Sequence, residues 1–83
     1  MDFEANAQLL VTTFTSGSIV VTLTWTDENN GAESVTMTSK GATGWANGAP
    51  VMGRAKAATA ITIATTGSFS ATYNIQAYLR TTT

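Results

Sequence analysis

The sequence predicts an all-β domain, a compact antiparallel β-sandwich of jelly-roll or immunoglobulin-like type with six to seven strands. Every odd-numbered position from Phe69 to Leu79 is apolar or aromatic, and the residues between them are mostly polar. The same alternation runs from Ile19 to Trp25. A period of two is typical of strands that bury one face. Two sheets that pack such faces against each other form a sandwich.

The first half of the chain contains three predicted strands. Residues 8–15 form the first, although the consecutive apolar residues 9–11 leave its buried face undecided. Residues 18–26 and 33–39 form a hairpin, because the Asn30-Gly31 pair between them tolerates positive φ at both positions.

The second half begins with a segment of different composition. Residues 40–50 contain three glycines and the only proline, and we expect a loop there. Such a loop is longer than the usual connection of about 4–6 residues, and long loops often carry function. Residues 51–56 form a short predicted strand, residues 59–65 another, and residues 69–80 the last.

The predicted core follows from the apolar phase of these strands. It consists of Ile19, Val21, Leu23, Trp25, Val35, Ile61, Ile63, Phe69, Tyr73, Ile75 and Leu79. We expect one domain over residues 1–83, with residues 1–7 as a candidate extended N-terminal arm. The N-terminus has two acids and no continuous apolar stretch, which predicts no signal peptide and synthesis in the cytoplasm.

Composition argues against catalysis. The chain has no histidine and no cysteine, and its acids are not grouped as an acid and a base. A hydroxyl activated by Lys40 or Lys56 is a weak alternative, because these lysines fall on predicted loops and edges. We therefore expect no enzyme, no cofactor and no catalytic residue.

One cluster of oxygen ligands lies in the predicted hairpin turn, from Asp27 to Glu33. Calcium takes six to eight such ligands, but Gly31 is fifth from Asp27, whereas the EF-hand glycine is sixth. A solvated turn is the favoured interpretation. We expect no metal site.

The charged residues and the length of the chain indicate which kinds of partner to expect. Four basic and five acidic residues are scattered along the chain, which indicates neither nucleic acid nor a membrane as partner. An 83-residue domain without disulfides has a small core and often relies on association. We therefore expect a homo-oligomer.

Two aromatic residues and one cation are candidate interface residues. Trp45 lies among glycines, where it either caps the end of the sandwich or forms a binding platform. Tyr78 and Arg80 fall on the polar face of the last strand. Because interfaces are enriched in aromatic residues and arginine, we expect Trp45, Tyr78 and Arg80 at a contact with a partner.

The strand and turn pattern resembles that of small β domains in tailed-bacteriophage virion proteins. The resemblance rests on VTLTWTDENNGAE at 21–33 and on VMGRAKAATAITIATTGSFSATYNIQAYLR at 51–80. In these domains a strand ending in Trp-Thr-Asp leads into a Gly-containing hairpin. Later, an Ala-Ile-Thr-Ile segment and a Thr-Thr-Gly turn precede a closing strand. Such domains occur in capsid-decorating, minor tail and fibre proteins.

The resemblance implies a virion structural protein, a capsid decoration or cement protein first. Its partners would then be copies of itself and a capsid or tail protein, with a trimer as the first expectation because many decoration proteins sit on threefold axes. The alternative is a carbohydrate-binding or host-adhesion module of a tail fibre that presents Trp45 or Tyr78 to glycans.

Overall fold

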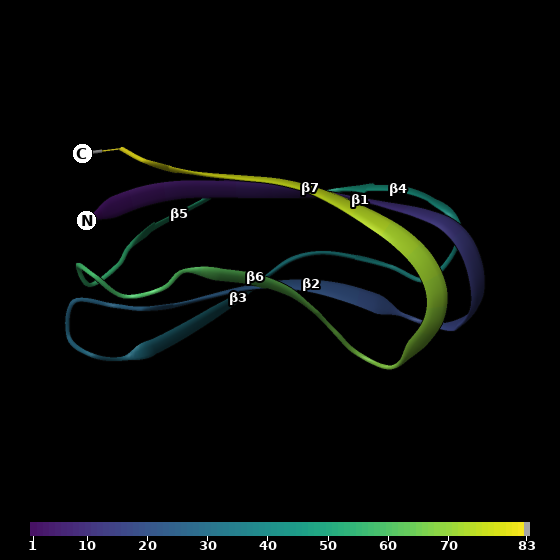
Figure 1. The fold of residues 1–83 in the computed structure, drawn as a ribbon, viewed down its shortest axis with the longest axis horizontal. Coiled ribbons are helices and arrows are strands. Elements are labelled where there is room, and N and C mark those ends of the chain that lie inside the picture. The colour runs from purple at the N-terminus through teal and green to yellow at the C-terminus, as the bar shows by residue number, and fades with distance from the viewer. Residues whose placement is uncertain (83) are drawn as a thin grey trace.

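The computed structural model describes residues 1–82 and confirms the all-β prediction: two antiparallel sheets pack as a β-sandwich (Figure 1). These residues contain no helix that could span a membrane. The seven strands are β1 (Asp2–Gly17), β2 (Ile19–Thr26), β3 (Ala32–Lys40), β4 (Gly44–Asn47), β5 (Val51–Arg54), β6 (Thr62–Thr66) and β7 (Phe69–Thr81).

The first sheet, sheet A, is built around β1. β7 pairs along one side of β1, while β5 and β4 pair with the first and second parts of its other side. In the second sheet, sheet B, β2 lies between β3 and β6. β1 and β7 bend together at the end opposite the termini, where β1 leads into β2 and β6 leads into β7 (Figure 1). The two tight connections therefore stack β1 over β2 and β7 over β6.

The core lies between β1 and β2. Alternate residues of both strands face inward and are almost completely buried, as the period of two requires. The buried residues are Phe3, Ala5, Ala7, Leu9, Val11, Ile19, Val21, Leu23, Met37 and Ala55. The Phe3 ring meets Trp25 edge to face with centroids 5.2 Å apart. A Cβ on Gly53 would lie 2.8 Å from this Phe3 ring, so a glycine allows β5 to cross it.

Two boundary predictions were wrong. Residues 1–7 are not an arm, because β1 begins at Asp2 and buries Phe3, Ala5 and Ala7. Residues 40–50 are not one long loop, because Gly44–Asn47 form β4 and pair with β1. In both segments, small residues reduce the contrast between the apolar and the polar positions of the strand. Strand pairing in sheet A provides the stability that the β-propensity of these segments does not.

The predicted hairpin between β2 and β3 is present, with one difference in its turn. Asn30 has a φ of 64°, but Gly31 does not have a positive φ. Gly31 is instead confined by its neighbour, since a Cβ there would lie 2.8 Å from Oδ2 of Asp27. A larger residue at Gly31 would therefore displace the Asp27 carboxylate, which accepts two backbone hydrogen bonds within the turn.

The predicted core is buried along β2 as far as Leu23 and less complete elsewhere. Ile19, Val21 and Leu23 are buried, whereas Leu79 is 46% exposed and does not belong to the core. Other predicted core residues, namely Trp25, Val35, Ile61, Ile63, Phe69, Tyr73 and Ile75, are only half-buried. β6 and β7 are outer strands of their sheets, and within residues 1–82 no further strand covers their inward-facing residues on that side.

Candidate functional site

The side of the sandwich formed by β6 and β7 is the candidate site, and we call it the open side. Its inward-facing residues from Ile61 to Leu79 are apolar for the most part and partly exposed to solvent. Phe69 and Tyr73 pack edge to face at 5.6 Å. The Tyr73 hydroxyl lies 3.1 Å from Oγ1 of Thr65, which links β7 to β6 across the gap between the sheets.

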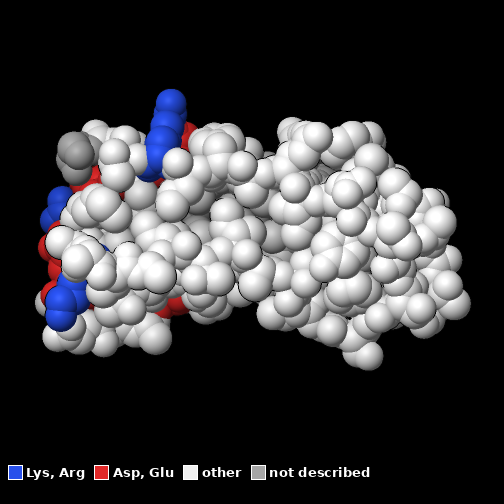
Figure 2. Space-filling view, in the orientation of Figure 1, with Lys and Arg blue, Asp and Glu red and all other residues white. Residues whose placement is uncertain are grey.

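Charge is nearly absent from this side. Figure 1 looks onto it, with β7 in front of β1 and β6 in front of β2. In the same orientation, Figure 2 shows the Lys, Arg, Asp and Glu side chains gathered at the end that holds the termini, while the remainder of the face is uncharged. An uncharged, partly apolar surface of this kind favours contact with protein over contact with a polyanion.

The charged end is held together by ion pairs. Nε of Arg54 lies 2.7 Å from Oδ1 of Asp2, and Nη2 of Arg80 lies 2.6 Å from Oε1 of Glu4. The hydrogen bond from Arg54 lowers the pKa of Asp2, because it stabilises the carboxylate. Arg80, one of the predicted interface residues, is therefore paired with an acid of its own sheet.

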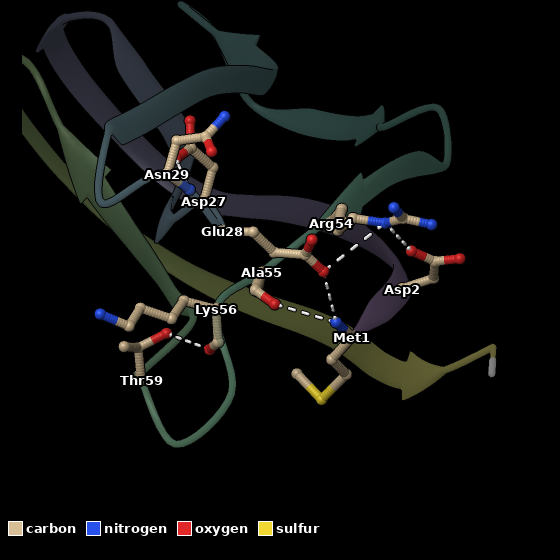
Figure 3. Close-up of polar contacts among 9 residues, drawn as sticks. All are labelled: Met1, Asp2, Asp27, Glu28, Asn29, Arg54, Ala55, Lys56 and Thr59. Atoms are coloured by element: carbon tan, nitrogen blue, oxygen red, sulfur yellow. Dashed lines mark hydrogen bonds and ion pairs between the residues drawn. The ribbon is translucent and has the colours of Figure 1, made fainter.

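The N-terminus is part of the same network (Figure 3). The Met1 ammonium donates to Oε1 of Glu28 at 3.1 Å and to the Ala55 carbonyl at 3.1 Å. Arg54 Nε lies 3.7 Å from the same Glu28 oxygen. These contacts join the start of β1, the β2–β3 turn and the end of β5. The charged end of the molecule therefore has a structural role.

In the acidic turn between β2 and β3, the Asp27 carboxylate accepts hydrogen bonds from the turn itself. Oδ1 of Asp27 accepts hydrogen bonds from the backbone N–H groups of Asn29 at 2.9 Å and Gly31 at 2.8 Å. These bonds, the one from Gly31 first, lower the pKa of Asp27, while interaction with Asp27 raises the pKa of Glu33. The Lys56 ammonium group donates a hydrogen bond to Oδ1 of Asn30. Within residues 1–82, no three His, Cys, Asp or Glu side chains are grouped to hold a metal ion.

Trp45 and Tyr78 both stand on the outer face of sheet A. Trp45 pairs with Leu10 and Tyr78 with Asn6, and these even-numbered residues of β1 face outward. Trp45 is 50% exposed and Tyr78 is 47% exposed. Trp45 therefore does not cap the end of the sandwich. The two rings lie on opposite sides of β1, four residues apart along it, and do not form a single cluster.

A shallow hollow lies beside Tyr78 on the same face. Its volume is about 240 Å³, and its lining comes from β1 and β7, with the side chains of Asn6, Gln8 and Gln76 around the ring. Each amide offers both a donor and an acceptor. The sequence marked Tyr78 but missed the three amides, since only the β1–β7 register brings them together.

In comparisons with known proteins, no family model, no curated protein and no solved structure matches the chain.

Proposed function

We propose that this chain is a non-enzymatic structural protein of a bacteriophage virion that acts as a capsid decoration or cement protein. The observation that carries the proposal is the open side, where both outer strands leave inward-facing apolar residues partly exposed. Exposed apolar patches of this kind on small domains mark contacts with other proteins. The resemblance to virion domains is what assigns the contact to a virus particle.

Energetic reasoning supports association. A domain of 83 residues buries only about 60–65% of the surface of its unfolded chain. It has no disulfide to offset that small core. Covering the open side would bury residues such as Ile63, Tyr73 and Ile75 further, at about 25 cal/mol for each Å² of apolar surface removed from water. Assembly therefore stabilises the fold as well as the particle.

Mass spectrometry of purified phage particles tests this proposal. Particles of the phage whose genome encodes the chain are separated into capsids and tails, and the chain is quantified in each fraction. We expect it in the capsid fraction, in a fixed ratio to the major capsid protein. Its absence from particles would refute a virion role, and its presence in tails alone would refute decoration.

The outer face of sheet A favours a second candidate function, binding of neutral glycans. An exposed aromatic ring offers a flat apolar surface, and the Asn and Gln amides beside Tyr78 can pair with hydroxyl groups. Calorimetric titration with cellohexaose and maltohexaose tests it. Saturable binding that is lost in Tyr78→Ala and kept in Thr62→Ala, a change at an exposed residue of sheet B, would support it. No heat with either sugar would contradict it for glucan chains.

A further inference from the structure

We infer that the free edge of β7 pairs with β7 of a second copy of this chain, antiparallel about a two-fold axis, so that two A sheets become one continuous sheet. The inference deepens the proposed structural role and rests on it only in requiring that the chain self-associates. It does not require a capsid.

The backbone of β7 presents a row of hydrogen-bonding groups to solvent. The Thr82 N–H donates to the Asp2 carbonyl at 3.0 Å, which fixes the phase of the β1–β7 ladder. Hydrogen-bonded and non-hydrogen-bonded pairs alternate along an antiparallel ladder, and the register is regular from Phe3↔Thr81 to Val11↔Tyr73. Five residues therefore direct their N–H and C=O groups away from β1: Tyr73, Ile75, Ala77, Leu79 and Thr81.

This edge lacks the features that normally prevent strand addition. Protected edges carry charged residues, proline or a bulge, or are covered by another segment. Residues 69–79 contain no charged residue and no proline. The two register shifts lie near the other end of β7, opposite 11–16 of β1. The outward-directed residues from Tyr73 to Leu79 thus form a regular, unprotected template.

A second β7 is the partner that this edge fits. The free edge is long, and within residues 1–82 only β1 and β7 are strands of matching length. β1 is paired on both sides, β6 spans only Thr62–Thr66, and the outer strand β3 (Ala32–Lys40) carries the charged residues Glu33 and Lys40. Among the described strands, a long free edge without charged residues over most of its length is therefore offered by the β7 of another copy.

Two-fold symmetry then specifies the register. If the axis passes beside Gln76, Tyr73 of one copy faces Leu79 of the other, and Ile75 faces Ala77. The outward-directed residues from Tyr73 to Leu79 of each copy are then paired, and each pair exchanges two hydrogen bonds. Tyr73 covers Leu79, which is 46% exposed in the single chain.

Charge is compatible with this register. Arg80 of one copy faces Thr72 of the other, so no like charges are opposed across the axis. On the outer face Gln76 meets its own counterpart, and Tyr78 lies opposite Asn74. The hollows of the two copies thereby become neighbours across the axis. A dimer about this axis replaces the trimer that the phage resemblance implies.

Ala77→Pro tests the pairing, with Ala77→Ser as its matched control. Proline removes an N–H that β1 does not use, and proline is tolerated where that N–H faces solvent. In sedimentation velocity over a range of concentrations, wild type and Ala77→Ser should reach twice the chain mass of 8.6 kDa. Ala77→Pro should remain at 8.6 kDa with an unchanged far-ultraviolet circular dichroism spectrum. A folded Ala77→Pro that still dimerises, a monomeric wild type or a trimer would each overturn the inference.

Charge exchange at Gln76 tests the register without touching the backbone. Because the axis opposes Gln76 to itself, Gln76→Lys and Gln76→Glu should each weaken self-association by up to about fivefold. An equal mixture of the two variants should form a heterodimer at least as readily as wild type dimerises. If the mixture associates no better than either variant alone, the proposed register is wrong.

Different experimental results would refute the capsid proposal and the inference of β7 pairing. A chain that is found in capsids but sediments as a monomer overturns the pairing and leaves decoration standing. A chain that dimerises as predicted but is absent from particles overturns decoration and leaves the pairing standing.

Discussion

Replacing Leu9 and Leu10 separately by alanine tests the arrangement of the core. The two leucines are adjacent in β1, but Leu9 is completely buried, whereas Leu10 lies on the outer face of sheet A between Trp45 and Asn74. Leu9→Ala leaves a cavity among packed side chains, which costs about 2.7–5 kcal/mol. Leu10→Ala loses only part of a transfer free energy and opens no enclosed cavity, so its cost is about 1 kcal/mol.

These costs are large against the total stability. At 0.05–0.15 kcal/mol per residue, a domain of this length has about 4–12 kcal/mol of stability, so Leu9→Ala removes a substantial share of it. Urea unfolding followed by tryptophan fluorescence measures both changes, at one protein concentration so that association contributes equally. We expect the midpoint to fall strongly for Leu9→Ala and slightly for Leu10→Ala. Equal costs, or the larger cost at Leu10, would show that β1 presents the opposite face to the core.

Two further predictions concern the β2–β3 turn and its response to calcium. Gly31→Val should lower the melting temperature more than Ala32→Val, because its Cβ would lie 2.8 Å from Oδ2 of Asp27 and would displace this carboxylate from its two backbone hydrogen bonds; similar shifts would contradict this reasoning. Added calcium should leave the melting temperature unchanged, since Oδ1 of Asp27 already accepts two backbone hydrogen bonds, and a clear rise would refute the solvated turn. A third prediction concerns acid: because the folded state lowers the pKa of Asp27, its contribution to stability is present above its ordinary pKa and is lost as the pH falls through the lowered value. Asp27→Asn should therefore lose less stability than wild type as the pH falls below about 4, and parallel unfolding curves would argue against this role.

The parts of the fold that the sequence predicted are those with strong alternation of large residues. β7 and the β2–β3 hairpin were predicted almost to their ends, because β-branched and aromatic residues mark both faces clearly. The first part of β1 has the same alternation, but Ala5 and Ala7 give it little hydrophobic contrast. β4 has only four residues, including Gly44, so it depends on its partner rather than on its own sequence.

Burial and surface geometry were harder to predict, because they depend on pairing between distant segments. Alternation assigned Leu79 to the inner face of β7 but could not reveal that β7 is an outer strand, with none of the other described strands beyond it. Similarly, nothing local indicates that Arg80 pairs with Glu4 across the β1–β7 ladder. The amides beside Tyr78 required the same long-range register.

Hydrogen exchange of single backbone amides, measured by nuclear magnetic resonance, tests the pairing of β7 most directly. In the single chain the amides of Asn74, Gln76 and Tyr78 bond to β1 and are protected, whereas those of Ile75 and Ala77 face solvent and exchange quickly. We predict that raising the protein concentration protects Ile75 and Ala77 while the other three change little. If Ile75 and Ala77 exchange quickly at every concentration, β7 does not pair with a second copy.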